Sequence, residues 1–182
     1  MRNRRTEPDD SGLGLVELIV ALLVSAIVVV ASATILVNSW LTQEDVTSTS
    51  RATTRGQLMG SAIERAIRNA KDFVVAPGDG DATELRVWTS LGGDMICQGF
   101  QLTAGSARMT SGSGVLAAVS TWPEWQRGVE KQDETPFFKR SGNVLTYSFA
   151  METDSAPVPI SGQAKMRTIH VYSTGETSPC WP

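Results

Sequence analysis

The chain has 182 residues, a length that fits one globular domain with additional segments. Its formal net charge is −3, and the basic residues are not clustered after Arg5. The sequence therefore lacks the basic patch that phosphate contacts need, and we do not expect nucleic acid as a main partner. Hydrophobic residues make up 41% of the chain, but they are concentrated before residue 42.

A polar leader at residues 1–12 precedes a long apolar segment. Arg2, Arg4 and Arg5 lie in the leader, and no charged residue occurs from Leu18 to Val37. A run of about 20 apolar residues is long enough to cross a bilayer as a helix. The positive leader predicts a cytoplasmic N-terminus and an extracytoplasmic C-terminal part. A cleaved secretory signal ending at Ala33 is the alternative.

Glu17 is the one charge at the start of this segment. A carboxylate inside a membrane span costs roughly 2.5–3.5 kcal/mol on insertion scales, so it marks a functional site by default. The alternative is a tolerated interfacial glutamate, because the N-terminus of a helix favours negative charge.

Gly12, the following Leu13-Gly14-Leu15-Val16-Glu17 and the apolar helix together resemble the class III signal of type IV prepilins and type II secretion pseudopilins. The resemblance implies that prepilin peptidase cuts after Gly12 and methylates the new amine of Leu13. It also implies that Glu17 pairs with the N-terminal amine of a neighbouring subunit. The chain departs from the family in having Leu13 where phenylalanine is commonest, and Thr34 in the region where major pilins often carry proline.

The resemblance also implies the partners and the location. The expected partners are prepilin peptidase, other pilin or pseudopilin subunits, the inner-membrane assembly platform and membrane lipid. The expected location is a single pass through the inner membrane, then a pilus or pseudopilus after assembly. Two other functions stay open: a pilus-associated binding module for DNA uptake or adhesion, and a membrane-anchored outer domain that forms no filament.

Residues 42–71 are expected to continue the helix from 13–41 as an amphipathic half. Apolar residues recur there at helical spacing and predict a face that packs on a core. These residues are Leu58, Met59, Ala62, Ile63, Ala66, Ile67 and Ala70. The segments Arg55-Gly56-Gln57-Leu58 and Ile63–Ala70 are similar to the helix end of J-type minor pseudopilins and W-type minor pilins, which implies a minor, tip-located subunit.

Residues 72–182 predict a small β-rich domain. The expected strands are Asp72–Ala76, Glu84–Ser90, Met95–Leu102, Ala107–Thr110, Val144–Met151 and Arg167–Ser173. One long helix followed by short strands indicates an α+β fold, in which the helix covers an antiparallel sheet, as in pilins. Gly112–Gly114, Trp122–Glu130 and Ala156–Gly162 are expected as loops, and Val115–Val119 as a strand or short helix. We expect the loop tryptophans to pack on the sheet, with docking of a neighbour as the alternative.

The sequence contains no catalytic motif, so we expect no enzymatic activity and no cofactor. His170, the single histidine, lies in a strand-like segment and is assigned a structural role. Asp79 and Asp81 are calcium candidates, although a plain turn is the preferred interpretation. Cys97 and Cys180 are expected to pair in an exported chain, with separate thiols or pairing to another chain as alternatives.

Overall fold

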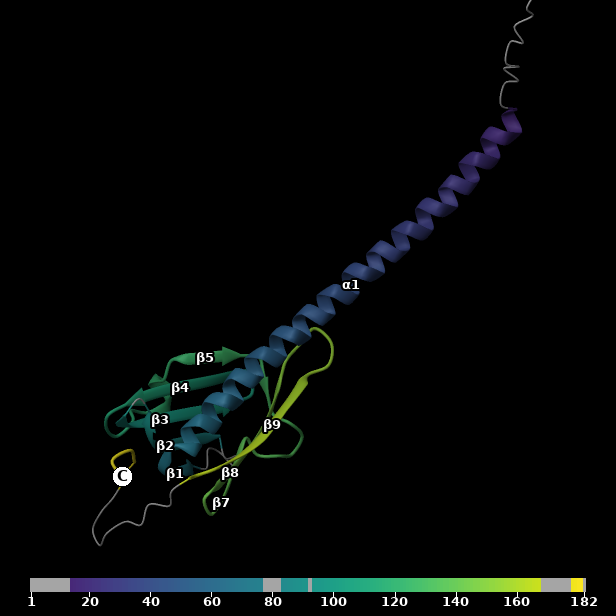
Figure 1. The fold of residues 1–182 in the computed structure, drawn as a ribbon. Helices are drawn as coiled ribbons and strands as arrows, with labels where there is room; N and C mark the ends of the chain where they lie inside the picture. Colours follow the sequence, from purple (N-terminus) through teal and green to yellow (C-terminus); the bar gives the residue numbers. More distant parts are fainter. Residues whose placement is uncertain (1–13, 77–82, 92, 168–177, 182) are drawn as a thin grey trace, which may run out of the picture. The chain divides into compact units, whose positions relative to one another are not determined.

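The computed structural model describes residues 14–76, 83–91, 93–167 and 178–181. The chain forms two compact units, residues 1–44 and 45–182. One helix, α1 (Leu15–Arg68), contributes to both units, and all described strands belong to the second (Figure 1). The predicted α+β class, with a long apolar N-terminal helix and an antiparallel β domain, is confirmed.

The part of α1 in the first unit has no charged residue from Leu18 to Val37, and its side chains are exposed. Two of its hydroxyl groups bond within the helix: Ser32 Oγ donates to the Val28 carbonyl at 2.8 Å, and Thr34 Oγ1 to the Val30 carbonyl at 2.9 Å. A helix surrounded by lipid must satisfy its polar groups internally in this way. By length and composition, α1 can cross a membrane.

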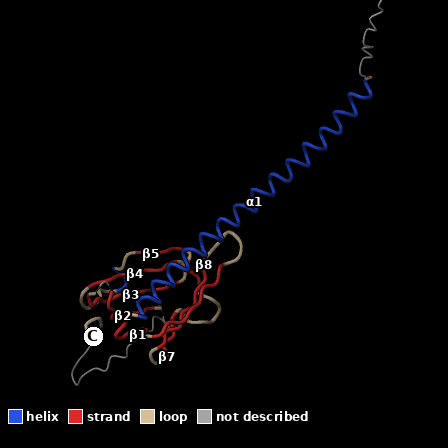
Figure 2. Tube along the Cα trace, in the orientation of Figure 1, coloured by secondary structure: helices blue, strands red, loops and turns tan. Residues whose placement is uncertain are grey.

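The strands of the second unit, red in Figure 2, form two sheets in which every described pairing is antiparallel. The first has the order β1-β2-β3-β4-β5, and in the second β8 pairs with β6 and β7 and also with β9. The strands are β1 (Ala70–Ala76), β2 (Glu84–Leu91), β3 (Asp94–Thr103), β4 (Ser106–Gly112), β5 (Glu124–Arg127), β6 (Val129–Glu130), β7 (Phe138–Ser141), β8 (Val144–Met151) and β9 (Val158–Lys165).

Both sheets share one core with the last turns of α1. The buried residues of the helix recur at i, i+3, i+4 spacing, the period of a one-sided helix face. They are Ala52, Gly56, Met59, Gly60, Ile63, Ala66 and Ile67. Phe73 and Phe100 of the first sheet and Phe149 of the second belong to the same cluster. A buried hydrogen bond from Thr89 Oγ1 to the Ala66 carbonyl, 2.9 Å long, fixes β2 to the helix.

Tyr147 lies in a slot between α1 and β9. It is paired with Gly162 across the β8–β9 ladder, and its hydroxyl lies 2.7 Å from where a Cβ of Gly60 would be. The hydroxyl donates a hydrogen bond of 2.9 Å to Glu64 Oε1. Burial, together with the negative charge of Glu64, raises the pKa of Tyr147 above its ordinary value. Two glycines thus provide the space in which one aromatic ring joins helix and sheet.

Arg140 of β7 joins the two sheets by binding the edge strand β1. Its guanidinium donates to the Phe73 carbonyl, lies 3.1 Å from Asp72 Oδ1 and stacks 4.3 Å from the Phe73 ring centroid. An unpaired strand edge is a template for aggregation, and a charged side chain bound to it prevents further strand addition.

The structure corrects several expected elements. Ala156–Gly162, expected as a loop, contains most of β9, because Val158 and Ile160 alternate with exposed residues and pack against the core. Pro159 is compatible with this strand because β9 pairs on one side only, with β8. Trp122–Glu130, also expected as a loop, contains β5 and β6.

Other boundaries differ by smaller amounts. The helix ends at Arg68 and β1 begins at Ala70, so the change to the strand comes earlier than expected. Val115–Val119 contributes only its last residue to a short 3-10 helix, Val119–Thr121. Strand β7 was not predicted, while Val144–Met151 is confirmed as β8. Of the expected strand Arg167–Ser173, Arg167 lies outside any strand and the rest lies outside the described residues.

Replacement of Gly162 by alanine is expected to destabilise the domain, because the new Cβ would overlap the Tyr147 ring. Overpacking of this kind typically costs about 1–3 kcal/mol. Gly114→Ala is the matched control, since nothing lies within 4 Å of its Cβ position. Chemical denaturation of both variants checks the prediction, and an unchanged midpoint for Gly162→Ala would show that the slot is not tight.

Candidate functional site

The candidate site is the first turn of α1. The helix begins at Leu15, directly after Gly14. The Gly14 carbonyl accepts hydrogen bonds from the amides of Glu17 at 2.8 Å and Leu18 at 3.2 Å. Glu17 is therefore in the first turn, close to the exposed amides of the helix N-terminus. This position lowers the cost of its negative charge by about 0.3–1 kcal/mol, less than the cost of placing a charge in a membrane span.

Glu17 has no cationic partner among the described residues. It is exposed, and it is the only charged residue between Gly14 and Gln43. A carboxylate in apolar surroundings is stabilised by a cation brought close to it. The arrangement therefore suits recognition of a positive group from outside this part of the chain. Gly12 and Leu13, the expected cleavage and methylation residues, lie outside the described residues.

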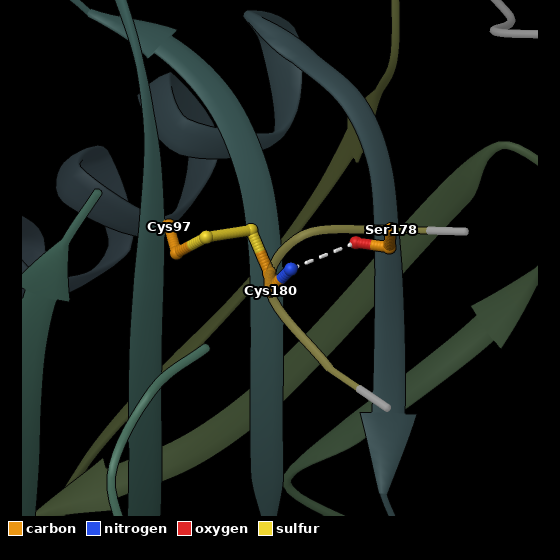
Figure 3. The surroundings of a disulfide bond; sticks show 3 residues. All are labelled: Cys97, Ser178 and Cys180. Carbon is orange, nitrogen blue, oxygen red and sulfur yellow. Dashed lines mark hydrogen bonds between the residues drawn. A yellow bond between two sulfur atoms is a disulfide. The ribbon is translucent and has the colours of Figure 1, made fainter. Parts of the chain in front are cut away.

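The expected pairing of the two cysteines is confirmed: Cys97 of β3 and Cys180 form a disulfide (Figure 3). Both are buried, and the Cys180 amide donates to Ser178 Oγ at 3.2 Å. The bond fixes the described C-terminal residues to the first sheet. Around it Leu116 and Trp122 form a second, smaller core.

The tryptophans of the 122–130 segment differ in exposure. Trp122 is 2% exposed, covers Gly99, and donates from Nε1 to the Ala117 carbonyl at 3.0 Å. Trp125 is partly buried, with its ring centroid 5.9 Å from that of Phe100. The expectation that these side chains pack on the sheet is confirmed for Trp122, which cannot dock a partner without leaving the core.

A polar pocket of about 340 Å³, missed by the sequence analysis, lies within the second unit. Arg51 and Arg55 of α1 line it together with Arg127, and Glu152 and Asp154 follow β8 on the other side. These residues are distant in sequence, and no motif signals that they meet. The charges are of both signs, so the pocket has no single electrostatic preference.

No group of three or more histidine, cysteine, aspartate or glutamate side chains that could hold a metal occurs among the residues that the structure describes. The calcium candidates Asp79 and Asp81 and the histidine His170 lie outside those residues. The expectations about metal, cofactor and enzymatic activity therefore remain predictions.

Replacing both Cys97 and Cys180 by serine is expected to lower the free energy of unfolding by about 2–4 kcal/mol, because the disulfide closes a long loop and restricts the unfolded chain. The sequence separation of the two residues is 83. Urea denaturation of oxidised, reduced and doubly substituted protein checks this. Equal stability of all three forms would contradict a structural role for the disulfide.

Comparisons with protein-family models, with curated proteins and with solved structures found no match. Function is therefore inferred from the residues and contacts of this chain.

Proposed function

We propose that this protein is a minor type IV pilin or pseudopilin, a structural subunit of a filament. In this proposal the chain enters the inner membrane through α1, is cut after Gly12 by prepilin peptidase, and is methylated at Leu13. The domain of residues 45–182 is then extracytoplasmic, and the chain packs into a pilus or secretion pseudopilus. The resemblance of the end of α1 to minor subunits favours a place at the tip, where the protein would start assembly.

The observation that carries the proposal is the position of Glu17. One carboxylate stands in the first turn of a helix whose next charged residue is Glu44. Cleavage after Gly12 would create an ammonium group four residues before Glu17, at the same end of α1. In a filament of parallel helices, the ammonium group of one subunit neutralises Glu17 of the next. Assembly thus removes the cost of two isolated charges in an apolar environment.

The confirmed fold is compatible with this role. The apolar part of α1 has no buried residue in the first unit, so its surface is available to lipid or to other helices. The second unit has its own core and a disulfide, which suits an exported domain.

Substitution of Gly12 by leucine is expected to block processing, because a bulky side chain obstructs the peptidase at the bond to be cut. Ala33→Leu is the matched control, since it blocks a signal peptidase acting after Ala33 and leaves the Gly12 site intact. Immunoblots of cells that express each variant distinguish precursor from mature chain. Cleavage of Gly12→Leu together with a block in Ala33→Leu would show that the segment is an ordinary secretory signal.

Substitution of Glu17 by alanine is expected to leave cleavage intact and to reduce incorporation into filaments by tenfold or more. Removing one member of a buried ion pair typically costs about 3–5 kcal/mol, because the other charge remains unpaired. Glu44→Ala, which removes a carboxylate beyond the apolar run, is the control and should assemble normally. The measurement is the ratio of subunit in sheared filaments to subunit in membranes, and a normal ratio for Glu17→Ala would contradict the pairing role.

A further inference from the structure

A second pocket, of about 310 Å³, lies where α1 ends and β1 begins. The described residues that line it provide three cationic side chains, one amide, one hydroxyl and one alanine: Arg68, Lys71, Arg167, Asn69, Ser90 and Ala70. Among the described residues no carboxylate lines it. In a chain with a net charge of −3, this concentration of positive charge is local and specific.

Backbone hydrogen bonds fix the three chain segments around the pocket. The Ser90 amide donates to the Asn69 carbonyl at 3.1 Å, which extends the β1–β2 ladder to the end of the helix. Arg167 follows Met166, which is buried and whose amide donates to the Asn143 carbonyl at 3.0 Å. Residues from the helix end, from β2 and from the segment after β9 therefore meet at this pocket, and backbone hydrogen bonds fix their positions.

The hydrogen-bond donors of the pocket differ in whether they already have a partner within the protein. Arg68 NH2 is paired with Glu64 Oε2 at 2.5 Å, and Lys71 Nζ lies 5.0 Å from the Trp88 ring centroid. The Arg167 guanidinium and the Ser90 hydroxyl have no hydrogen-bonding or ionic partner within the described ranges. Two donors of different chemistry thus remain available, and the ammonium group of Lys71 has no carboxylate partner in these ranges.

The helix dipole accounts for only part of this arrangement. A cation in the last turn of a helix is favourable beside the negative C-terminal end, and this explains Arg68. The dipole is equivalent to about half a negative charge at this end of the helix. Lys71 of β1 and Arg167, which follows β9, line the same pocket as Arg68 and together carry two positive charges. The positive charge in the pocket therefore exceeds what the helix end balances, and a bound negative charge would offset the remainder.

We propose that this pocket binds an oxyanion of the phosphate type, either free or as the headgroup of a larger molecule. Arg167 and Lys71 donate charge-assisted hydrogen bonds to its oxygens, and Ser90 adds a neutral one. The pocket volume of about 310 Å³ is sufficient to admit such an anion. The proposal does not depend on the proposed filament function.

The test is a calorimetric titration of inorganic phosphate into the full-length protein in uncharged detergent, at low ionic strength. We expect saturable binding that weakens as sodium chloride is added. Arg167→Ala and Lys71→Ala should each weaken binding by roughly tenfold, as expected when one charge-assisted hydrogen bond is lost. Arg127→Ala and Lys139→Ala, which remove exposed cations outside this pocket, should bind like the wild type.

Absence of saturable binding, or equal weakening in the control variants, would overturn the site. Circular dichroism of each variant verifies folding, so that a lost signal is not assigned to an unfolded chain. A second titration compares nanodiscs that contain phosphatidylglycerol with nanodiscs of phosphatidylcholine alone, in the presence of free phosphate. Competition by the anionic nanodiscs assigns the site to a lipid headgroup, and unaffected phosphate binding assigns it to a free anion.

Discussion

The structure depends on one helix that must be stable in two different environments. From Leu18 to Val37, α1 has no charged residue, and the hydroxyl groups of Ser32 and Thr34 bond within the helix, which suits lipid or a bundle of similar helices. In the second unit the same helix has one apolar face, and two sheets cover that face. Glu17 is the exception in the first environment, since it places a full charge where the rest of the segment excludes charge. A function that brings a positive charge to Glu17 would neutralise this carboxylate without any change to the fold.

The second unit is held together by contacts that join its layers rather than by the strands alone. Tyr147 connects β8 to α1 through Glu64, and Arg140 connects β7 to the edge of β1. The disulfide adds the C-terminal residues to β3. The Tyr147 and Arg140 contacts each combine a packed side chain with a polar group that has a hydrogen-bond partner.

Much of the fold was predictable because its signals are local. The helical spacing of Ile63, Ala66 and Ile67 identified the buried face of α1, and Val144–Met151 was predicted as a strand with the bounds of β8. The strand β9 was missed because Pro159 and Gly162 are turn residues in most contexts. Its stability depends on Tyr147 covering Gly162, a contact that only the folded chain provides.

The two pockets could not be predicted from the sequence, because the residues that line them meet only in the folded chain. Arg127 and Arg167 lie far in sequence from the helix residues that they meet, and neither belongs to a motif. The cysteine pair was predicted from compartment and even count, an argument that required no geometry. Glu17 was found because a charge in an apolar run is visible in the sequence alone.

The central claim is that Gly12 and Glu17 act together. Cleavage after Gly12 creates the N-terminal ammonium group that pairs with Glu17 of a neighbouring subunit. The measurement that tests it most directly is the mass of the N-terminal peptide of the protein recovered from membranes. The account predicts a chain that begins at Leu13 and carries one methyl group on its amine. A chain that begins at Met1, or one cut after Ala33, would contradict it.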